Sequence, residues 1–467
     1  MIERVKSVLL ILLILCTMVL GYLNLDLGLV GDGSNQPTFA LQSFKFYDFM
    51  RPHSFHYAVG GISFAKLYDP RVQESVWGAL APKIANILSD STKLVEIDLA
   101  RYANEYRGGT LILNFPVYVT AKDLTQMEAT GAVPGELFID EILVGAKNLL
   151  IYDKSTQKRY EVFSGAPSVT AEEIRAAVGD HVTNRSYRRL SDRFSLNEVL
   201  VDGVEHHNYV LIPYQYDYIV PSFEIRKEFD PQSEFQIFEV ARRVFGSNLD
   251  FVKQLVDAEG STVLMYGYGD RSLTFGNDGV ISYKSKPDGS RIKSTWLEAM
   301  QIAVSFLEAL GPLPEGIHFE SVIEHSPYDF EFSFAYTVQQ YEVTDEKGDA
   351  VTSTVRVKSK QVTEARRHVV SAGEALPDPG IERMYSVDRC LSDYQERIVE
   401  EYLLDLGRVA TLQDPSFNSD DYFFSIRAAI REIQLVMMQQ EQRLEPHWRV
   451  GIGDRVYLFR AHDGRLR

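Results

Sequence analysis

Few residue clusters in this chain have the types and spacing that catalysis or metal binding requires. His206 and His207 are adjacent, and neighbouring side chains on a strand face opposite sides, so the pair is poorly placed to hold one metal ion. Asp270 and Asp278 flank strand-like sequence, but the alternating ligands and final glutamate of a calcium-binding loop are missing, so we interpret both as turn formers. Cys390 precedes a predicted helix and is either a reactive thiol or, as is usual for a free cysteine, a small buried side chain.

No local motif assigns an enzymatic reaction. The sequence contains no GxSxG elbow, no HExxH pair, no phosphate-binding loop and no cysteine–histidine signature of a known enzyme family. We therefore expect no catalytic residues, no metal ligands, no cofactor and no enzymatic activity.

One basic run occurs in an otherwise acidic chain. Residues 186–193 read SYRRLSDR, whereas the 467-residue chain carries a formal net charge of −17. Such a run usually forms a solvated face, but it could also contact an acidic wall polymer or an acidic partner, which a deep basic pocket would favour. The overall acidity argues against binding to nucleic acid or to an anionic membrane surface.

The element that positions the rest of the chain is the apolar stretch at residues 7–25. It reads SVLLILLILCTMVLGYLNL without a charge, and an apolar run of this length crosses a bilayer core as a helix. Arg4 and Lys6 precede the run, and the next basic residue is Lys45. The positive-inside rule therefore places residues 1–6 in the cytoplasm and the chain after the helix outside the cell membrane.

The processing of this stretch has three possible outcomes. A cleaved signal peptide requires small residues after the apolar run, where the sequence has Tyr22, Asn24 and Asp26. A lipoprotein signal at Cys16 requires a small residue directly before the cysteine, where Leu15 stands. We favour an uncleaved, single-pass anchor and leave the two alternatives open.

One face of the predicted membrane helix suits contact with another helix. Thr17 and Gly21 are four residues apart, Asn24 is three residues further on, and Leu10 and Ile14 lie near the same face at 3.6 residues per turn. Small residues at such spacing let a second helix approach closely, and a polar neighbour can bond across the interface. Chance placement of these residues near a helix end is the alternative.

The remaining sequence predicts an α+β fold of antiparallel sheets with helices packed on them. We expect helices at residues 70–89 (kinked or split at Pro82), 121–130, 170–177 (capped by Thr170 and Glu173), 235–245, 249–256, 296–310 and 391–406. Expected strands include 109–115, which stops at Pro116, 328–344 and 455–460, with a hairpin turn at 276–279; residues 426–442 fit a helix or a strand.

Changes in composition and segments rich in glycine and proline divide the chain into several parts. We predict a cytoplasmic tail at 1–6, a membrane helix at 7–25, a stalk at 26–39, and α+β domains at 40–228, 229–375 and 376–467. Of the two cysteines, Cys16 lies in the helix and only Cys390 lies beyond it, so the external part cannot form an internal disulfide. That usage is compatible with the surface of a Gram-positive bacterium.

Several stretches resemble the YycH family. GTLILNFPVYV resembles the family's apolar strand ending in Phe-Pro, and ELFIDEILVGAKNLLIYDKSTQKRYEV resembles the paired strands that follow it. FEVARRVFGSNLDFVKQL before YGYGDRSLTFGNDGVISY is similar to the family's helix and tyrosine-containing hairpin. IREIQLVMMQQEQRLEPHWRVGIGDRVYLF resembles the closing segment, and the second half is also similar to the related regulator YycI.

The resemblance implies a role in regulation. YycH proteins are accessory regulators of the YycG (WalK) sensor kinase, which controls cell-wall metabolism, and they assemble with the kinase and a YycI-like protein largely through membrane helices. Under that reading, the partner-binding residues are Leu10, Ile14, Thr17, Gly21 and Asn24. The alternative is a stand-alone external domain that binds or inhibits a wall polymer or a peptidase.

Overall fold

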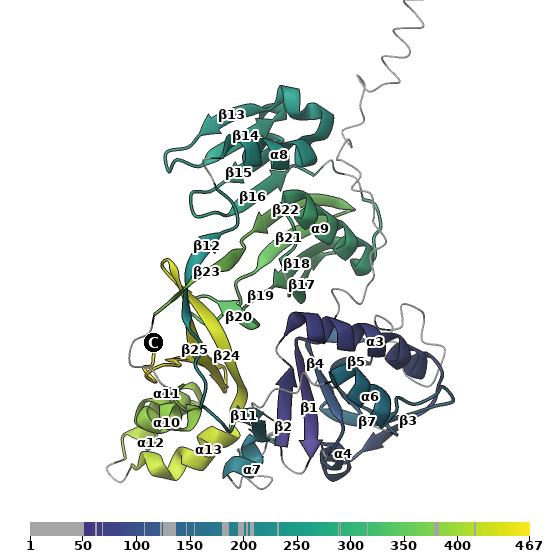
Figure 1. Cartoon of the computed structure of the whole chain (residues 1–467), viewed down its shortest axis with the longest axis vertical. Coiled ribbons are helices and arrows are strands. Elements are labelled where there is room, and N and C mark those ends of the chain that lie inside the picture. Colours follow the sequence, from purple (N-terminus) through teal and green to yellow (C-terminus); the bar gives the residue numbers. More distant parts are fainter. Residues whose placement is uncertain are drawn as a thin grey trace, which may run out of the picture.

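The computed structural model describes residues 51–467, apart from short gaps of which 125–136, 180–185, 195–199 and 378–382 are the longest. Three large sheets with helices packed around them make up this part of the chain (Figure 1), which confirms the predicted α+β class. The predicted membrane helix at residues 7–25 lies outside the described residues. Among the residues that are described, no helix is long and apolar enough to cross a membrane.

The first sheet has nine strands in the order β11-β8-β2-β1-β4-β5-β6-β7-β3. Its strands are β1 (Ser54–Gly60), β2 (Ser63–Leu67), β3 (Ser91–Ile97), β4 (Leu111–Thr120), β5 (Phe138–Val144), β6 (Leu149–Asp153), β7 (Lys158–Ser164), β8 (Ser186–Arg189) and β11 (Leu211–Pro213). The accompanying elements are α3 (Pro70–Ser89), α4 (Leu99–Glu105), α6 (Ala171–Val178), α7 (Leu190–Phe194) and the small pair β9 (Leu200–Val201) and β10 (Val204–Glu205). Leu111 and Leu113 belong to one core cluster and Ile112 to another, so both faces of β4 are buried. This burial on both faces explains why the sequence of β4 is a continuous apolar run rather than an alternation of apolar and polar residues.

Helix α3 packs on the first sheet and runs as one helix across Pro82, so the predicted split does not occur. Its N-terminus is capped by Asp69, whose side chain accepts a hydrogen bond from Arg71 N at 2.9 Å. A proline inside a helix costs about 3 kcal/mol. Burial of one large apolar side chain returns about 1.5–3 kcal/mol, and Trp77, Leu80 and other residues of α3 are buried in the core.

Strand β4 continues past Pro116 to Thr120, so the predicted end at that proline was wrong. The register with β5 shifts between Asn114 and Val119. Proline lacks the N–H that a regular ladder needs, and such an irregularity is where a sheet tolerates it.

The central sheet has eight strands in the order β13-β14-β15-β16-β22-β21-β18-β17. These are β13 (Lys253–Val256), β14 (Thr262–Tyr266), β15 (Arg271–Phe275), β16 (Ile281–Ser285), β17 (His318–Ser326), β18 (Asp329–Ala335), β21 (Ser353–Lys358) and β22 (Gln361–Arg367). Helices α8 (Glu234–Phe245) and α9 (Trp296–Leu310) bury their apolar sides in the same core cluster as the inward residues of this sheet (Figure 1). The helix predicted at 249–256 was wrong, because η3 (Gly246–Phe251) is a 3-10 turn and β13 follows it as a strand.

The third sheet is assembled from distant parts of the sequence, in the order β19-β20-β24-β25-β12-β23 with β26 on β25. Its strands are β12 (Ser222–Lys227), β19 (Thr337–Val338), β20 (Tyr341–Thr344), β23 (Val370–Leu376), β24 (Ile430–Gln440), β25 (Arg443–Ile452) and β26 (Arg455–Arg460). The strand predicted at 328–344 is therefore three strands, since β18 stays in the central sheet while β19 and β20 join the third. The ambiguous stretch 426–442 is mainly the strand β24, which pairs in parallel with β20.

Short helices pack beside the third sheet near the long β24–β25 hairpin (Figure 1). They are α10 (Val387–Asp393), α11 (Gln395–Asp405), α12 (Val409–Leu412), η5 (Ser419–Tyr422) and α13 (Phe423–Ala428). The helix predicted at 391–406 is thus two helices, α10 and α11, that meet at Tyr394. The domain boundaries at residues 228 and 375 stay a prediction.

Candidate functional site

The predicted partner-binding face of the membrane helix lies outside the described residues. Leu10, Ile14, Thr17, Gly21 and Asn24 all precede residue 51, where the description begins. Their role in helix contact stays a prediction. The other candidate residues belong to the predicted external part of the chain.

The candidate metal ligands have different structural roles where the structure describes them. Asp278 Oδ1 accepts a hydrogen bond from Val280 N at 3.0 Å, which stabilises the turn between β15 and β16. Asp270 follows the short 3-10 turn η4 (Gly267–Gly269), and its carbonyl accepts a hydrogen bond from Lys286 N at 2.8 Å. His206 and His207 lie outside the described residues. Within the described ranges, no three His, Cys, Asp or Glu side chains are grouped to hold a metal ion.

Cys390 lies inside α10 rather than before it, and its side chain is buried in the core beside the third sheet. Burial, followed by the nearby Asp393 carboxylate, raises the pKa of its thiol to about 12. The thiolate is the nucleophilic form of cysteine. The structure therefore supports a packing role for Cys390 rather than a reactive one.

The basic run at 186–193 is used for contacts within the molecule. Arg189 Nε pairs with Asp192 at 2.6 Å, and Arg193 Nη2 reaches Asp388 of α10 at 3.1 Å. The Arg188 guanidinium lies over the Tyr214 ring, 3.6 Å from its centroid. The run thus joins the edge of the first sheet to the C-terminal helices, and its acidic partners come from the same chain.

Polar side chains gather at a second contact, where the three sheets meet. A cavity of about 30 Å³ at this junction is lined by Lys66 of β2, His318 of β17, Glu342 of β20 and Gln434 of β24. These strands belong to the first, central and third sheets. Arg51 is buried beside them, and its Nη2 donates a hydrogen bond to the carbonyl of Ile317 at 3.0 Å. We call this group of residues the polar junction.

Glu342 accepts hydrogen bonds from two residues near the polar junction and is only 9% exposed. Its Oε2 accepts a hydrogen bond from Gln434 Nε2 at 3.1 Å, and its Oε1 lies 3.4 Å from Arg449 Nη1. The same arginine nitrogen lies 3.6 Å from Glu432 Oε1. One guanidinium from β25 therefore serves two carboxylates, one from β20 and one from β24.

One group beside the polar junction, Glu320 of β17, has a pKa near neutral pH. Burial raises the pKa of Glu320 to about 7, and Glu342 adds to this increase while Arg449 opposes it. Burial, together with the nearby Arg51 charge, lowers the pKa of His318 to about 4. Burial also lowers the pKa of Lys66, against the attraction of Glu432 and Glu342. Near pH 7, Glu320 is therefore partly protonated and His318 is neutral.

Sequence reasoning did not identify the polar junction. Glu342 stands between Tyr341 and Val343, and Arg449 stands between Trp448 and Val450. A charge inside an apolar strand is the signal that could have singled out these positions, since a buried charge needs a partner. The sequence does not show which strands come together to provide that partner.

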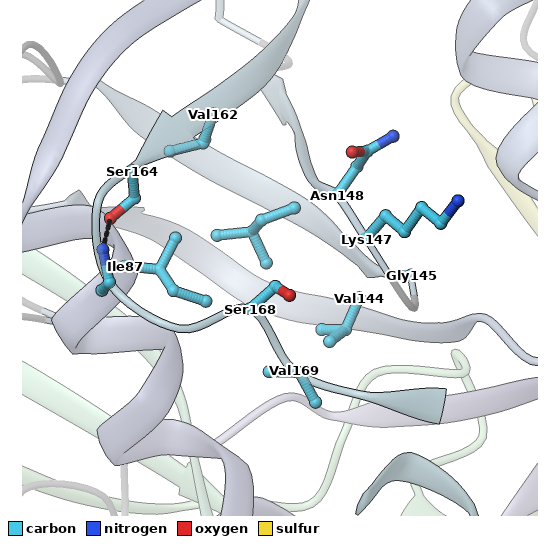
Figure 2. A pocket seen from close by; sticks show the side chains of 11 residues that line it. Ile87, Val144, Gly145, Lys147, Asn148, Val162, Ser164, Ser168 and Val169 are labelled. Atoms are coloured by element: carbon cyan, nitrogen blue, oxygen red, sulfur yellow. Dashed lines mark hydrogen bonds between the residues drawn. The ribbon is translucent and has the colours of Figure 1, made fainter. Parts of the chain in front are cut away.

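A further cavity of about 50 Å³ lies beside the first sheet, between the end of α3, the β5–β6 turn and the loop after β7 (Figure 2). Ile87, Val144 and Val169 form part of its apolar lining, and Ser164 Oγ accepts a hydrogen bond from Ala166 N at 3.0 Å at one side. Sites for organic ligands usually enclose a few hundred Å³. This cavity and the one at the polar junction have room for little more than water.

Comparisons with known proteins address the fold directly. No family model matches the chain, and no curated protein matches it. The crystal structure of YycH from Bacillus subtilis matches with a TM-score of 0.52 and 15% sequence identity, over 89% of this chain and 97% of that chain. This chain has the YycH fold. The likeness to YycH is not confined to one sheet, because no single sheet and its helices make up as much as the 89% of the chain that is matched.

The YycH likeness confirms the resemblance drawn from the sequence at the level of the fold. An identity of 15% does not transfer residue roles. The role of any residue here must therefore be argued from this chain's own geometry.

Proposed function

We propose that this protein is a membrane-anchored, extracytoplasmic regulator of a two-component sensor histidine kinase that controls cell-wall metabolism. The observation that carries the proposal is the YycH fold, which extends over 89% of the chain. The uncharged apolar stretch at residues 7–25 supports an anchor, with residues 1–6 in the cytoplasm and the three sheets outside. We assign the protein no enzymatic activity.

The partners in this proposal are a kinase of the YycG (WalK) type and a YycI-like protein. The contact with the kinase runs through the helix face formed by Leu10, Ile14, Thr17, Gly21 and Asn24. Gly21 lets the two helix backbones approach closely, and Asn24 can bond across the interface. Regulation then requires that this contact differ between two states of the kinase, because equal binding to both states leaves the equilibrium between them unchanged.

Within the external part, the polar junction is the place where the three sheets meet. The cavity of the polar junction is lined by residues of the first, central and third sheets, and Glu342 and Arg449 pair within the third sheet beside it. A change in charge or contact at the junction acts on all three sheets at once. We propose that an envelope signal is relayed through this region toward the anchor.

A pull-down from native membranes tests the proposal. The wild-type chain is compared with Gly21→Leu, which places a bulky side chain where the two helices are predicted to approach closely. Val19→Leu is the matched control. At 100° per residue Val19 lies on the opposite side of the helix and at nearly the same depth. We expect wild type and Val19→Leu to recover a sensor kinase, and Gly21→Leu to recover clearly less while staying in the membrane.

The other outcomes are also informative. Recovery of no kinase by any of the three chains would overturn the regulatory proposal and favour a stand-alone external domain. Equal recovery by all three would keep the regulatory role and move the kinase contact from the helix to the external part.

A further inference from the structure

The central sheet ends in an uncovered strand. β13 is its first strand and, among the described residues, pairs only with β14. All four residues of β13 are exposed, including the apolar side chains of Leu255 (52%) and Val256 (66%). An exposed edge strand offers unpaired N–H and C=O groups to a second chain, and most proteins protect such edges.

The hydrogen bonds of the β13–β14 hairpin determine which backbone groups face outward. Asp257 N donates to Ser261 O at 3.0 Å, and Ser261 N donates to Asp257 Oδ1, so these two residues occupy a hydrogen-bonded position of the ladder. Such pairs alternate with non-hydrogen-bonded pairs along an antiparallel ladder. Because the register is regular along β13, Gln254 and Val256 direct their N–H and C=O groups away from β14. Their spacing is the one that an added antiparallel strand requires.

The side chains of this edge form a short, ordered row. Lys253 and Leu255 occupy alternate positions of β13 and share one face of the sheet. Asp257, at the next alternate position, directly follows the strand, and its Oδ1 accepts hydrogen bonds from Glu259 N and Ser261 N, which leaves Oδ2 for a further partner. Lys253 Nζ lies 5.8 Å from the ring centroid of Tyr268, which is fully exposed beside the edge. The row thus places an apolar residue between a cation and an anion.

We propose that β13 pairs with β13 of a second copy of this chain, antiparallel about a two-fold axis through Leu255. In that register Leu255 lies opposite Leu255 of the second copy, and Gln254 forms a hydrogen-bonded pair with Val256 of the second copy. Lys253 then faces Asp257 of the second copy, and the two-fold axis repeats this ion pair. A shift of two residues in either direction would place Leu255 opposite Lys253 or Asp257, so the charges specify the register.

The order of the charges favours a second copy over an unrelated strand. About a two-fold axis, the lysine of each copy lies opposite the aspartate of the other, so the row is complementary to itself. Four residues of paired strand bury less than the roughly 1,200 Å² of a typical stable interface. Pairing in free solution is therefore expected to be weak. Anchoring both copies in one membrane raises their effective concentration, and we expect pairing there.

Disulfide trapping of the full chain in liposomes tests the proposal. Cys16→Ser removes the cysteine of the predicted membrane helix, and Cys390 is buried. Leu255→Cys then places two thiols directly opposite each other in a non-hydrogen-bonded pair, where Cα atoms are about 4.5 Å apart and within disulfide reach. Phe235→Cys, on α8 and 74% exposed, is the control. We expect at least about tenfold more covalent dimer from Leu255→Cys.

A second variant tests the backbone pairing. Val256→Pro removes an N–H that faces away from β14, and sheets tolerate proline at such edge positions. Added to Leu255→Cys, it should abolish the covalent dimer while thermal unfolding stays the same, whereas Val256→Ala should keep the dimer.

Three results would overturn the proposal. The first is dimer formation by Leu255→Cys no greater than by Phe235→Cys. The second is a dimer that persists with Val256→Pro. The third, in native membranes, is a cross-linked product whose mass shows a different protein, which would assign the edge to another partner.

Discussion

Arg367 donates a hydrogen bond from Nε to Glu228 Oε2 at 3.0 Å, although 139 residues separate the two in the sequence. Arg367 is 1% exposed, and its other nitrogens donate to the carbonyls of Leu307, at 3.3 Å, and Pro312. One side chain therefore joins the end of β22, the segment after β12 and the last turn of α9. The Leu307 carbonyl also accepts a hydrogen bond from Gly311 N at 3.1 Å, and a cation near a helix C-terminus interacts favourably with the helix dipole.

Loss of the Arg367 guanidinium should strongly destabilise the central sheet and its helices. Arg367→Leu removes the arginine donor from Glu228 and from the carbonyls of Leu307 and Pro312, and breaking such a buried pair costs about 3 kcal/mol or more. The neighbouring Arg366→Leu is the control, because Arg366 is exposed and exposed substitutions usually change stability by less than about 0.5 kcal/mol. Denaturant unfolding of the full chain in detergent measures both. Equal stability of the two variants would contradict the assigned role of Arg367.

Gly464 should tolerate no side chain. Its backbone has φ of +75°, and a Cβ atom there would overlap the ring of Tyr385. We expect Gly464→Ala to cost about 2–4 kcal/mol, from left-handed backbone strain plus displacement of the ring. Gly407→Ala provides a matched control, since Gly407 has φ of +70° but a Cβ atom there would meet nothing within 4 Å. Thermal unfolding should show a clearly larger loss of stability for Gly464→Ala than for Gly407→Ala. Similar losses of stability would rule out the proposed overlap with the Tyr385 ring.

Cys390 should be inert in the folded protein. Its thiol is buried, and its pKa is raised to about 12, so almost none is thiolate at pH 8. In a Cys16→Ser background, we expect a thiol reagent to label the native chain very slowly and the denatured chain at the rate of an ordinary cysteine. Rapid labelling of the native chain would show that α10 opens easily.

Local features of the fold could be predicted from the sequence, because their signals lie within a few residues. Thr170 and Glu173 form the predicted capping box, with hydrogen bonds of 3.2 and 2.9 Å. Helix α9 spans the predicted residues 296–310, and the turn at 276–279 joins β15 to β16 as expected. Each of these depends on neighbouring side chains and backbone preferences alone.

Assignments that depend on distant contacts could not be made from the sequence. The stretch 328–344 has strand-like composition throughout, but nothing local shows that β20 leaves the central sheet to pair with β24. Arg367 comes close to Glu228, and Arg449 to its two carboxylates, only through the pairing and packing of strands that lie far apart in the sequence. Charges at interior strand positions indicate that a partner exists but do not identify it.

Glu320 should make stability depend on pH in a defined direction. Its pKa is raised to about 7 from an ordinary value of 4.5, so the folded state binds a proton more tightly than the unfolded state does. The resulting penalty on folding is absent well below pH 4.5, grows as the pH rises toward 7 and is complete above it. Because a third of the side chain is exposed, we expect Glu320→Gln to increase the free energy of unfolding by about 1–2 kcal/mol at pH 8. Most of this gain should disappear by pH 5.

The control for this measurement is Glu324→Gln, an exposed glutamate on the same strand, which should change stability little at either pH. Denaturant unfolding of wild type and both variants at pH 5 and pH 8 gives the comparison. A gain for Glu320→Gln that is equal at the two pH values would mean that neutral packing, rather than the charge of Glu320, limits the stability of the polar junction. A gain that appears only at pH 8 would show that the charge of Glu320, on β17 beside the polar junction, limits stability near neutral pH, as a relay of an envelope signal through this region would permit.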